Sequence, residues 1–278
     1  MTLAVKPLTG ALGAEIIGAD IRREGDFQAI RDAFIQFSVI AIRGQDLSPE
    51  DHLAFARRWG EINVNRFFKP VPDHPEIAMV LKEPDQKTAI GESWHTDHSY
   101  DRVPAMGSIL HALETPATGG DTMFVSMAAA WEGLSDGLKA VLKGLKAWHS
   151  SRHVFGATMA GAESRQDGRI GNADRAEQDA LHPIVIRHPL SGREGLYVNP
   201  QFTTDIDGWS AEESAALLGY LYQHCGKPEY ACRVRWAPGT VTMWDNRATW
   251  HKAVNDYHGQ RRLMHRVTVE GVALEAAA

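Results

Sequence analysis

Cysteine is scarce in this chain, because its 278 residues include only Cys225 and Cys232. Two thiols are too few for a disulfide framework or a cysteine-rich zinc site, and such usage fits a reducing compartment. An excess of basic residues is also missing, since 29 Lys and Arg stand against 35 Asp and Glu, a net charge of −6. Proteins that bind nucleic acid normally carry a basic excess. The composition therefore predicts no nucleic-acid partner.

Long hydrophobic runs are missing as well. The longest apolar stretch, residues 33–42, is interrupted by Gln36 and Ser38, whereas crossing a bilayer takes roughly 20 apolar residues. Residues 1–20 show neither the basic start nor the cleavage pattern of a signal peptide. We therefore expect a cytoplasmic protein without a membrane partner. Glycine-rich phosphate-binding motifs are also lacking, which disfavours a nucleotide-dependent reaction.

Short apolar runs separated by Pro and Gly dominate the chain and predict strands. These runs cover residues 38–43, 77–81, 107–113, 121–127, 182–188, 195–199, 232–236, 240–244 and 262–270. Helices are predicted at the start of 27–43, over 48–60, over 126–145 and over 210–226. The strands do not alternate regularly with helices, which argues against a doubly wound parallel sheet. A mainly β fold with flanking helices, of the jelly-roll or β-sandwich barrel type, is the expectation.

The chain contains neither internal repeats nor low-complexity linkers. Its length allows one large domain or two small ones, at roughly 100–200 residues per domain. We expect a single domain over residues 1–278. Residues 156–180 are rich in Gly, Ala and charged side chains and show little periodicity. Because a long loop in a compact domain is usually functional or disordered, this stretch is predicted to be an active-site lid.

Thirteen histidines are the most unusual part of the composition. In the segment WHTDH, His95 and Asp97 are two residues apart, so that on a strand both side chains would point to one face. His251 follows a predicted strand much later in the chain. Two imidazoles and one carboxylate are typical of the ligand set of non-haem Fe(II) oxygenases. The same set also serves hydrolytic zinc enzymes, and a metal-binding module without turnover is a third reading.

Two arginines follow these residues. Arg262 and Arg266 are four residues apart in a predicted strand, which places their side chains on one face. Neighbouring guanidinium groups repel each other unless each meets an anion, and the guanidinium fork binds carboxylates and sulfonates through two hydrogen bonds. The pair therefore predicts one or more small anionic ligands.

The segments WHTDHSYDRVPAMGSILHALETPATGGDT (residues 94–122) and WDNRATWHKAVNDYHGQRRLMHRVTV (residues 244–269) resemble the TauD/TfdA family. These are Fe(II)- and 2-oxoglutarate-dependent dioxygenases of the taurine and 2,4-dichlorophenoxyacetate type. The similarity extends through residues 198–218 and covers most of the chain. The resemblance implies a double-stranded β-helix, which is a jelly roll of the cupin type. It also implies an enzyme that uses Fe(II), O2 and 2-oxoglutarate and forms succinate and CO2.

The resemblance also assigns roles to individual residues. His95, Asp97 and His251 would be the iron ligands, and Thr122 and Arg262 would hold the distal carboxylate of 2-oxoglutarate. Positions expected at the substrate are Arg266 for an anionic group, Phe155 and Phe202 as aromatic neighbours, and His98 and Arg66 as polar groups.

Departures from the taurine-type pattern bear on the substrate. Gly91 stands where the taurine-type enzymes have an asparagine, and residues 63–70 contain no histidine. Taurine is therefore disfavoured, and a sulfonate, sulfate ester, carboxylate or phenoxyalkanoate is expected instead. Because Asp97 is retained, hydroxylation is expected rather than halogenation, and hydroxylation beside a heteroatom leads to an aldehyde or ketone. The alternative is a hydroxylase or desaturase of an amino-acid-derived metabolite. The family resemblance also implies a homo-oligomer, either a dimer or a tetramer.

Overall fold

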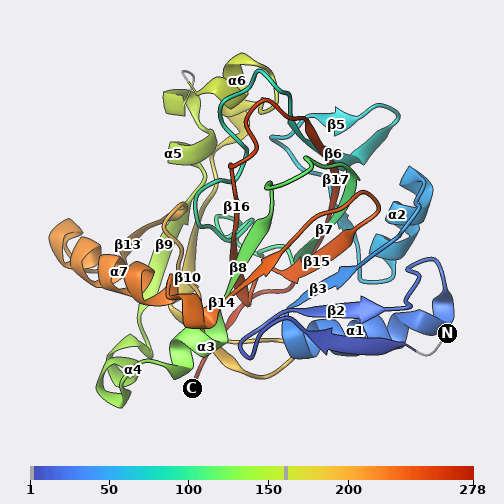
Figure 1. Cartoon of the computed structure of the whole chain (residues 1–278). Helices are drawn as coiled ribbons and strands as arrows, with labels where there is room; N and C mark the ends of the chain where they lie inside the picture. The colour runs from blue at the N-terminus through green and yellow to red at the C-terminus, as the bar shows by residue number, and fades with distance from the viewer. Residues whose placement is uncertain (1–2, 160–161) are drawn as a thin grey trace.

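The computed structural model describes residues 3–159 and 162–278. Two β layers occupy the centre of the molecule, with α1 and α2 on one side, α3, α4 and α7 on the other, and α5 and α6 at one end (Figure 1). The longer helices are α1 (Phe27–Phe37), α2 (Pro49–Arg57) and α7 (Ala211–Cys225). The shorter ones are α3 (Met127–Glu132), α4 (Asp136–Leu142), α5 (Arg152–Phe155) and α6 (Glu163–Gln166).

A nine-stranded sheet forms the larger layer, in the order β1-β2-β3-β15-β7-β17-β6-β5, with β4 beside β17. Its strands are β1 (Ala4–Pro7), β2 (Ala14–Ile17), β3 (Val39–Ile42), β15 (Val241–Asp245), β7 (Gly107–Glu114), β17 (Arg262–Val269), β6 (His74–Lys82), β5 (Pro70–Val71) and β4 (Ile62–Asn63). Every pairing is antiparallel except that of β2 with β3. Antiparallel pairing throughout the central strands is what a jelly roll requires.

A three-stranded sheet forms the opposing layer, in the order β14-β8-β16. Its strands are β14 (Ala231–Val234), β8 (Thr122–Ser126) and β16 (Thr249–Ala253). Two further sheets, β10-β9-β13 and β12-β11-β18, lie outside this pair of layers. They comprise β9 (Lys146–Ser150), β10 (Asp179–Pro183), β13 (Thr203–Ile206), β11 (Val185–Arg187), β12 (Glu194–Leu196) and β18 (Glu275–Ala276). The molecule is therefore mainly β with flanking helices, and the expected jelly roll is confirmed.

The two faces of the large sheet bury different apolar cores. Val39 and Ala41 pack with Phe124 and Trp244 between the two layers, whereas Ile40 packs with the helices on the outside of the large sheet. This division follows from the period of two along a strand. Residues of this inner core, among them Leu110 and Trp244, also line the cavity described below.

Helix boundaries agree with the capping signals in the sequence. Ser48 caps α2 by accepting a hydrogen bond from the backbone N–H of Asp51, whose side chain accepts one from Ser48 in return. Ser210 and Glu213 make the same reciprocal pair at the start of α7. A cap of this kind stabilises a helix by about 1 kcal/mol, and both predicted starts are confirmed.

The single strand predicted over residues 182–188 is wrong, because two strands of different sheets occupy this stretch. Strand β10 ends at Pro183, and β11 begins at Val185. Proline has no N–H to donate to a strand ladder, so pairing with β9 stops there. Ile184 instead donates its N–H to the carbonyl of Leu145, and the chain changes sheet.

Several of the thirteen histidines lie together on the outer face of the large sheet, beside α2. His52 is only 1% exposed, and one ring nitrogen bonds to the carbonyl of Ile109 at 3.2 Å while the other has no partner. Burial, reinforced by nearby His111, lowers the pKa of His52 from 6.5 to about 3. Burial, reinforced by His111 and His74, lowers the pKa of His265 to about 4. In the folded protein these two rings are therefore neutral.

This histidine group predicts a loss of stability in weak acid. Because the pKa values are lower in the folded than in the unfolded chain, the unfolded state binds more protons below pH 6.5. Above pH 6.5 the free energy of unfolding is not reduced by these histidines. Below it, the free energy of unfolding falls until the pH reaches the folded-state pKa, about 4 for His265 and about 3 for His52. The fall is at most about 1.4 kcal/mol per pH unit for each histidine. Urea unfolding of the metal-free protein at pH 7, 6 and 5 measures this slope. His52→Leu should flatten it, whereas replacement of the exposed His258 by Asn should not, and equal slopes would contradict the assignment.

Candidate active site

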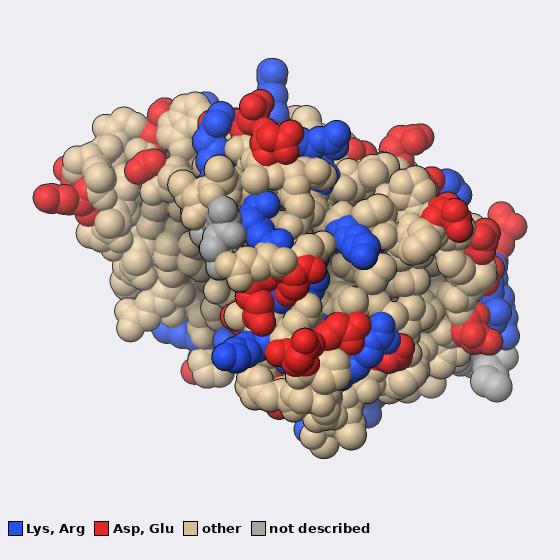
Figure 2. Space-filling model, turned by 90° about the horizontal axis from the view of Figure 1, so that it is seen from above, with Lys and Arg blue, Asp and Glu red and all other residues tan. Residues whose placement is uncertain are grey.

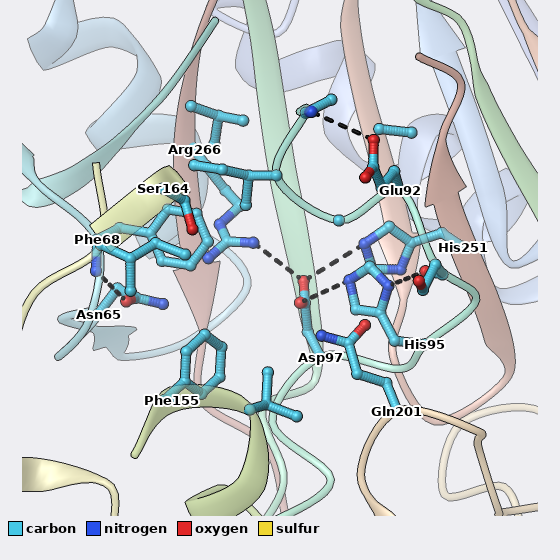
Figure 3. Close-up of a pocket in the computed structure, with 18 of the residues that line it drawn as sticks. Asn65, Phe68, Glu92, His95, Asp97, Phe155, Ser164, Gln201, His251 and Arg266 are labelled. Atoms are coloured by element: carbon cyan, nitrogen blue, oxygen red, sulfur yellow. Dashed lines mark hydrogen bonds and ion pairs between the residues drawn. The ribbon is translucent and has the colours of Figure 1, made fainter. Parts of the chain in front are cut away.

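His95, Asp97 and His251 converge in the interior of the jelly roll (Figure 3). One ligand atom from each residue lies within 4.8 Å of the others. Nε2 of His95 is 3.6 Å from Oδ1 of Asp97, and Nε2 of His251 is 3.8 Å from Oδ2. These separations are too long for hydrogen bonds. The three side chains therefore point at a common space without forming hydrogen bonds to one another, as ligands of one metal ion would.

The backbone brings the two histidines together across the fold. His95 donates its N–H to the carbonyl of His251 at 3.1 Å, and His251 donates back to His95 at 2.8 Å. His251 belongs to β16, but His95 makes only this isolated bridge, and Asp97 lies in the turn that follows. The side chains of His95 and Asp97 therefore meet through a turn and not along one face of a strand. The turn is completed at His98, whose φ of 60° is left-handed.

Hydrogen bonds orient the two ligands that come first in the chain. Nδ1 of His95 bonds to the carbonyl of Ser93 at 2.8 Å, so it carries the proton and leaves the lone pair of Nε2 for the shared space. Ser108, on β7, donates its hydroxyl to Oδ2 of Asp97 at 3.1 Å. The sequence did not identify Ser108 as a site residue. It lies eleven residues after Asp97 in the chain, and no sequence pattern links the two positions.

The electrostatics of this cluster suit a divalent metal ion. Burial by itself raises the pKa of Asp97, but Arg266 and the two histidines outweigh it and hold the pKa well below its usual range. Burial and neighbouring His95 lower the pKa of His251 well below 6.5. The carboxylate is therefore ionised, and the His251 imidazole is neutral. Because a metal ion needs ligands in these protonation states, the donor set fits Fe(II), for which two histidines and a carboxylate are typical.

A buried arginine, Arg262, is part of the lining of the same cavity. Arg262 is 4% exposed, donates through Nε to the carbonyl of Gly120 at 3.1 Å, and lies 5.6 Å from the centre of the Trp236 ring. Among the described residues no carboxylate lies within ion-pair distance of it. Trp236 also donates to the hydroxyl of Thr122 at 3.0 Å, so the Thr122 proton is free for a ligand. The pair fits the distal carboxylate of 2-oxoglutarate, and Trp236 is a supporting residue that sequence reasoning missed.

Arg266 lies on the same face of β17 as Arg262. Both arginines are buried, while Leu263 and His265 between them are half-buried, which confirms the predicted alternation. Nη1 of Arg266 lies 3.3 Å from Oδ2 of Asp97, and its guanidinium stands 4.3 Å from the centre of the Phe68 ring. Its Nε is buried without a hydrogen-bond partner. The predicted anion-binding arginine is therefore close to the metal cluster and pairs with Asp97.

The predicted aromatic and polar neighbours divide into two groups. Phe155, Phe202 and His98 line a cavity of about 230 Å³ together with the metal cluster and both arginines. Arg66 is outside this lining. It contacts both carboxylate oxygens of Asp101 at 2.8 Å, and Asp101 also holds Nδ1 of His98 at 2.9 Å. The substrate contact of Arg66 therefore stays a prediction. In this structure Arg66 pairs with Asp101, and Asp101 in turn orients the ring of His98.

Two segments lie over the cavity and are tied together. Residues 89–93 and residues 162–170 both contribute to its lining. Glu163 accepts hydrogen bonds from the hydroxyl of Thr88 and from the backbone N–H groups of Lys87 and Thr88, which together lower its pKa to about 2. Arg169 donates to the carbonyl of Thr88 at 3.0 Å. The predicted lid, residues 156–180, contains short helices, and its residues 160–161 lie outside the described part of the chain.

The outer surface over this end carries charges of both signs. Figure 2 looks down on it and shows Lys and Arg interspersed with Asp and Glu. On the face drawn, the described residues form no extended basic patch.

Among the described residues no helix is long and apolar enough to span a membrane. Cys225 and Cys232 are both buried free thiols.

A jelly roll with two histidines, a carboxylate and a buried arginine in one interior cavity defines the class of 2-oxoglutarate-dependent oxygenases. Comparison with known proteins agrees. The chain belongs to the TauD/TfdA family, since the family model described as "Taurine catabolism dioxygenase TauD, TfdA family" matches residues 4–268.

Individual relatives span nearly the whole chain. An alkylsulfatase of Acinetobacter baylyi is 35% identical over 97% of this chain and 85% of that protein. An alpha-ketoglutarate-dependent sulfate ester dioxygenase of Pseudomonas putida is 34% identical over 98% of this chain and 90% of that protein. The crystal structure of a taurine dioxygenase from Burkholderia xenovorans aligns with a TM-score of 0.83 at 32% identity, covering 99% of this chain and 92% of that one.

Proposed function

We propose that this protein is an Fe(II)- and 2-oxoglutarate-dependent dioxygenase that hydroxylates a small organic sulfate ester. The observation that carries the proposal is that the cluster of His95, Asp97 and His251 opens into the same cavity as two buried arginines, Arg262 and Arg266. One cation is needed for 2-oxoglutarate and another for an anionic substrate. The sulfate ester is chosen from the predicted anions because two relatives at 34–35% identity bear names for that chemistry.

The cavity residues have distinct parts in this proposal. His95, Asp97 and His251 hold Fe(II), which, once bound, supplies the activation of O2 that is coupled to decarboxylation of 2-oxoglutarate. Arg262 supplies a charge that persists at any physiological pH for the distal carboxylate, and the Thr122 hydroxyl, which accepts from Trp236, adds a donor.

The rest of the lining positions the substrate. Arg266 attracts the sulfate group, and Phe155 and Phe202 cover its alkyl chain and keep water away from the reacting carbon. Hydroxylation at the carbon that bears the sulfate oxygen gives an unstable product. Its new hydroxyl loses a proton while the carbon–oxygen bond to sulfate breaks, and an aldehyde and inorganic sulfate result. One molecule each of O2 and 2-oxoglutarate is consumed, with succinate and CO2 formed.

A product assay tests the reaction. Purified protein with Fe(II), ascorbate, 2-oxoglutarate and hexyl sulfate should form succinate, hexanal and inorganic sulfate in equal amounts. Hexanesulfonate, hexanoate, taurine and an aryloxyacetate are the comparison substrates. Succinate formation that rises with one of these and not with hexyl sulfate would refute the sulfate ester. Activity with Zn(II) in place of Fe(II) would refute the oxygenase itself.

A second candidate is hydroxylation or desaturation of a larger metabolite, including the amino-acid-derived kind expected from the sequence. It is favoured by 32% identity, over 95% of this chain, to a pentalenolactone F synthase of Streptomyces arenae. The largely aromatic and aliphatic lining, with Phe68, Leu110 and Phe202, could cover such a molecule. Mass spectrometry distinguishes the outcomes, because hydroxylation adds one oxygen, desaturation removes two hydrogens, and sulfate ester cleavage releases sulfate.

The proposal extends to the whole molecule. Residues 1–278 form one domain, which is supported by a family match over 4–268, and residues 156–180 act as its lid. The two free thiols support a reducing compartment such as the cytoplasm. The homo-oligomer, a dimer or tetramer, stays a prediction that light scattering on the purified protein tests.

A further inference from the structure

Three guanidinium groups line the cavity, and only two of them are explained above. Arg262 lies beside Thr122, and Arg266 pairs with Asp97. The third is Arg165, which is part of α6 in the segment over the cavity. An arginine keeps its charge at any physiological pH, so a third cation facing a small cavity needs an anion.

Arg165 lacks that anion within the protein. Within the described part of the chain, its Nη1 reaches only the carbonyl of Gly171, at 3.4 Å, and its Nη2 is buried without a hydrogen-bond partner. The two acids nearest in the chain are already engaged, because Glu163 accepts from Lys87 and Thr88 while Asp167 pairs with Arg169 at 2.7 Å. Among the described residues no carboxylate lies within ion-pair distance of Arg165.

Helix α6 lies on the Arg266 side of the cavity. Ile170 donates its N–H to the carbonyl of Ser164 and forms a β-bridge with Phe68. The guanidinium of Arg266 stands over that same Phe68 ring, and Figure 3 shows Ser164 next to Arg266 and Phe68. The segment that carries Arg165 is therefore packed against the wall that holds Arg266.

We propose that Arg165 binds the sulfate group of the substrate together with Arg266, an inference that rests on the proposed function. A sulfate monoester offers three terminal oxygens, enough acceptors for two guanidinium forks, whereas a carboxylate offers two. Because Arg266 pairs with Asp97 in this structure, Arg165 supplies the cation that is free to meet the incoming anion. The bound sulfate then fastens residues 162–170 over the cavity, which excludes water from the reacting carbon.

Binding of hexyl sulfate to the protein loaded with Fe(II) and 2-oxoglutarate, without O2, tests this inference by calorimetry. Arg165→Met, which keeps length and loses charge, should weaken binding about tenfold or more, and Arg165→Lys should weaken it less. The exposed Arg175 of the same segment provides the matched control, so Arg175→Met should bind hexyl sulfate as the wild type does. The affinity for 2-oxoglutarate should be unchanged in all three variants.

Hydrogen exchange supplies a second readout that does not depend on turnover. Hexyl sulfate should protect residues 162–170 in the wild type and fail to protect them in Arg165→Met. Equal affinity of Arg165→Met and wild type for hexyl sulfate overturns the role of Arg165, whatever the reaction. Arg165-dependent binding of hexanoate in place of hexyl sulfate refutes the proposed substrate and keeps the arginine. Failure of the wild type to bind either anion overturns both.

Discussion

Asp97→Ala is expected to abolish succinate formation that depends on substrate. Asp97 is the one carboxylate of the metal cluster, and without it two neutral imidazoles remain beside a buried arginine, Arg266. That guanidinium then faces the metal position unpaired, and its positive charge repels a divalent cation. We expect the affinity for Fe(II), or for Mn(II) as an oxygen-stable probe, to fall by more than about 100-fold, since changes to supporting residues alone cost about 10- to 100-fold. Calorimetric titration measures the affinity, and a succinate assay measures the activity.

Two further variants separate the charge from the fold. Asp97→Asn keeps the size of the side chain and loses its charge, so it should bind the metal almost as poorly as Asp97→Ala. The exposed Asp205 on β13 provides a control, because Asp205→Ala removes one carboxylate that does not line the cavity and should leave metal affinity unchanged. Unfolding of each metal-free variant by urea shows whether the fold persists. Full activity of Asp97→Ala would mean that another residue supplies the carboxylate.

The sequence predicted those parts of the site that depend on local periodicity or on family resemblance. The shared face of Arg262 and Arg266 followed from the period of two in β17, and the structure confirms it. The convergence of His95 with His251 across 156 residues was expected only through the resemblance, because spacing in one strand says nothing about which strands meet. The antiparallel bridge between these two residues is the contact that brings them together.

Other parts depended on contacts that no pattern contains. Arg66 was expected at the substrate, and no pattern in the sequence predicted its pairing with Asp101, which also bonds to the left-handed His98. Supporting residues such as Ser108 and Trp236 are identified by what they touch and have no distinctive sequence context. Arg165 could not be predicted for a different reason. Its stretch of sequence lacks periodicity, and only the structure shows that the neighbouring acids are bonded to other residues.

Arg262→Met is expected to raise the KM for 2-oxoglutarate by about 100-fold or more. The reason is that Arg262 is 4% exposed, and the described residues offer it the Gly120 carbonyl and the Trp236 ring but no carboxylate. A charge-assisted hydrogen bond contributes about 1.5–3 kcal/mol, so losing a two-bond contact with a carboxylate amounts to about 3 kcal/mol or more, which is roughly 150-fold. The KM for the sulfate ester, measured with 2-oxoglutarate in excess, should change far less, because Arg266 and Arg165 remain.

The stability of Arg262→Met should not fall together with its affinity for 2-oxoglutarate. In the ligand-free protein Arg262 is a buried cation without an anion, and burial lowers its pKa from the usual 12.5. Removing such a charge relieves a desolvation cost, so Arg262→Met should unfold at the same or a higher urea concentration than the wild type. Arg262→Lys keeps the charge but loses the planar fork, so it should give an intermediate KM for 2-oxoglutarate. Arg187→Met, at an exposed position of β11, is the control and should leave this KM unchanged. A normal KM for 2-oxoglutarate in Arg262→Met would place the cosubstrate elsewhere, whereas a raised KM with undiminished stability shows that the loss is not a loss of fold.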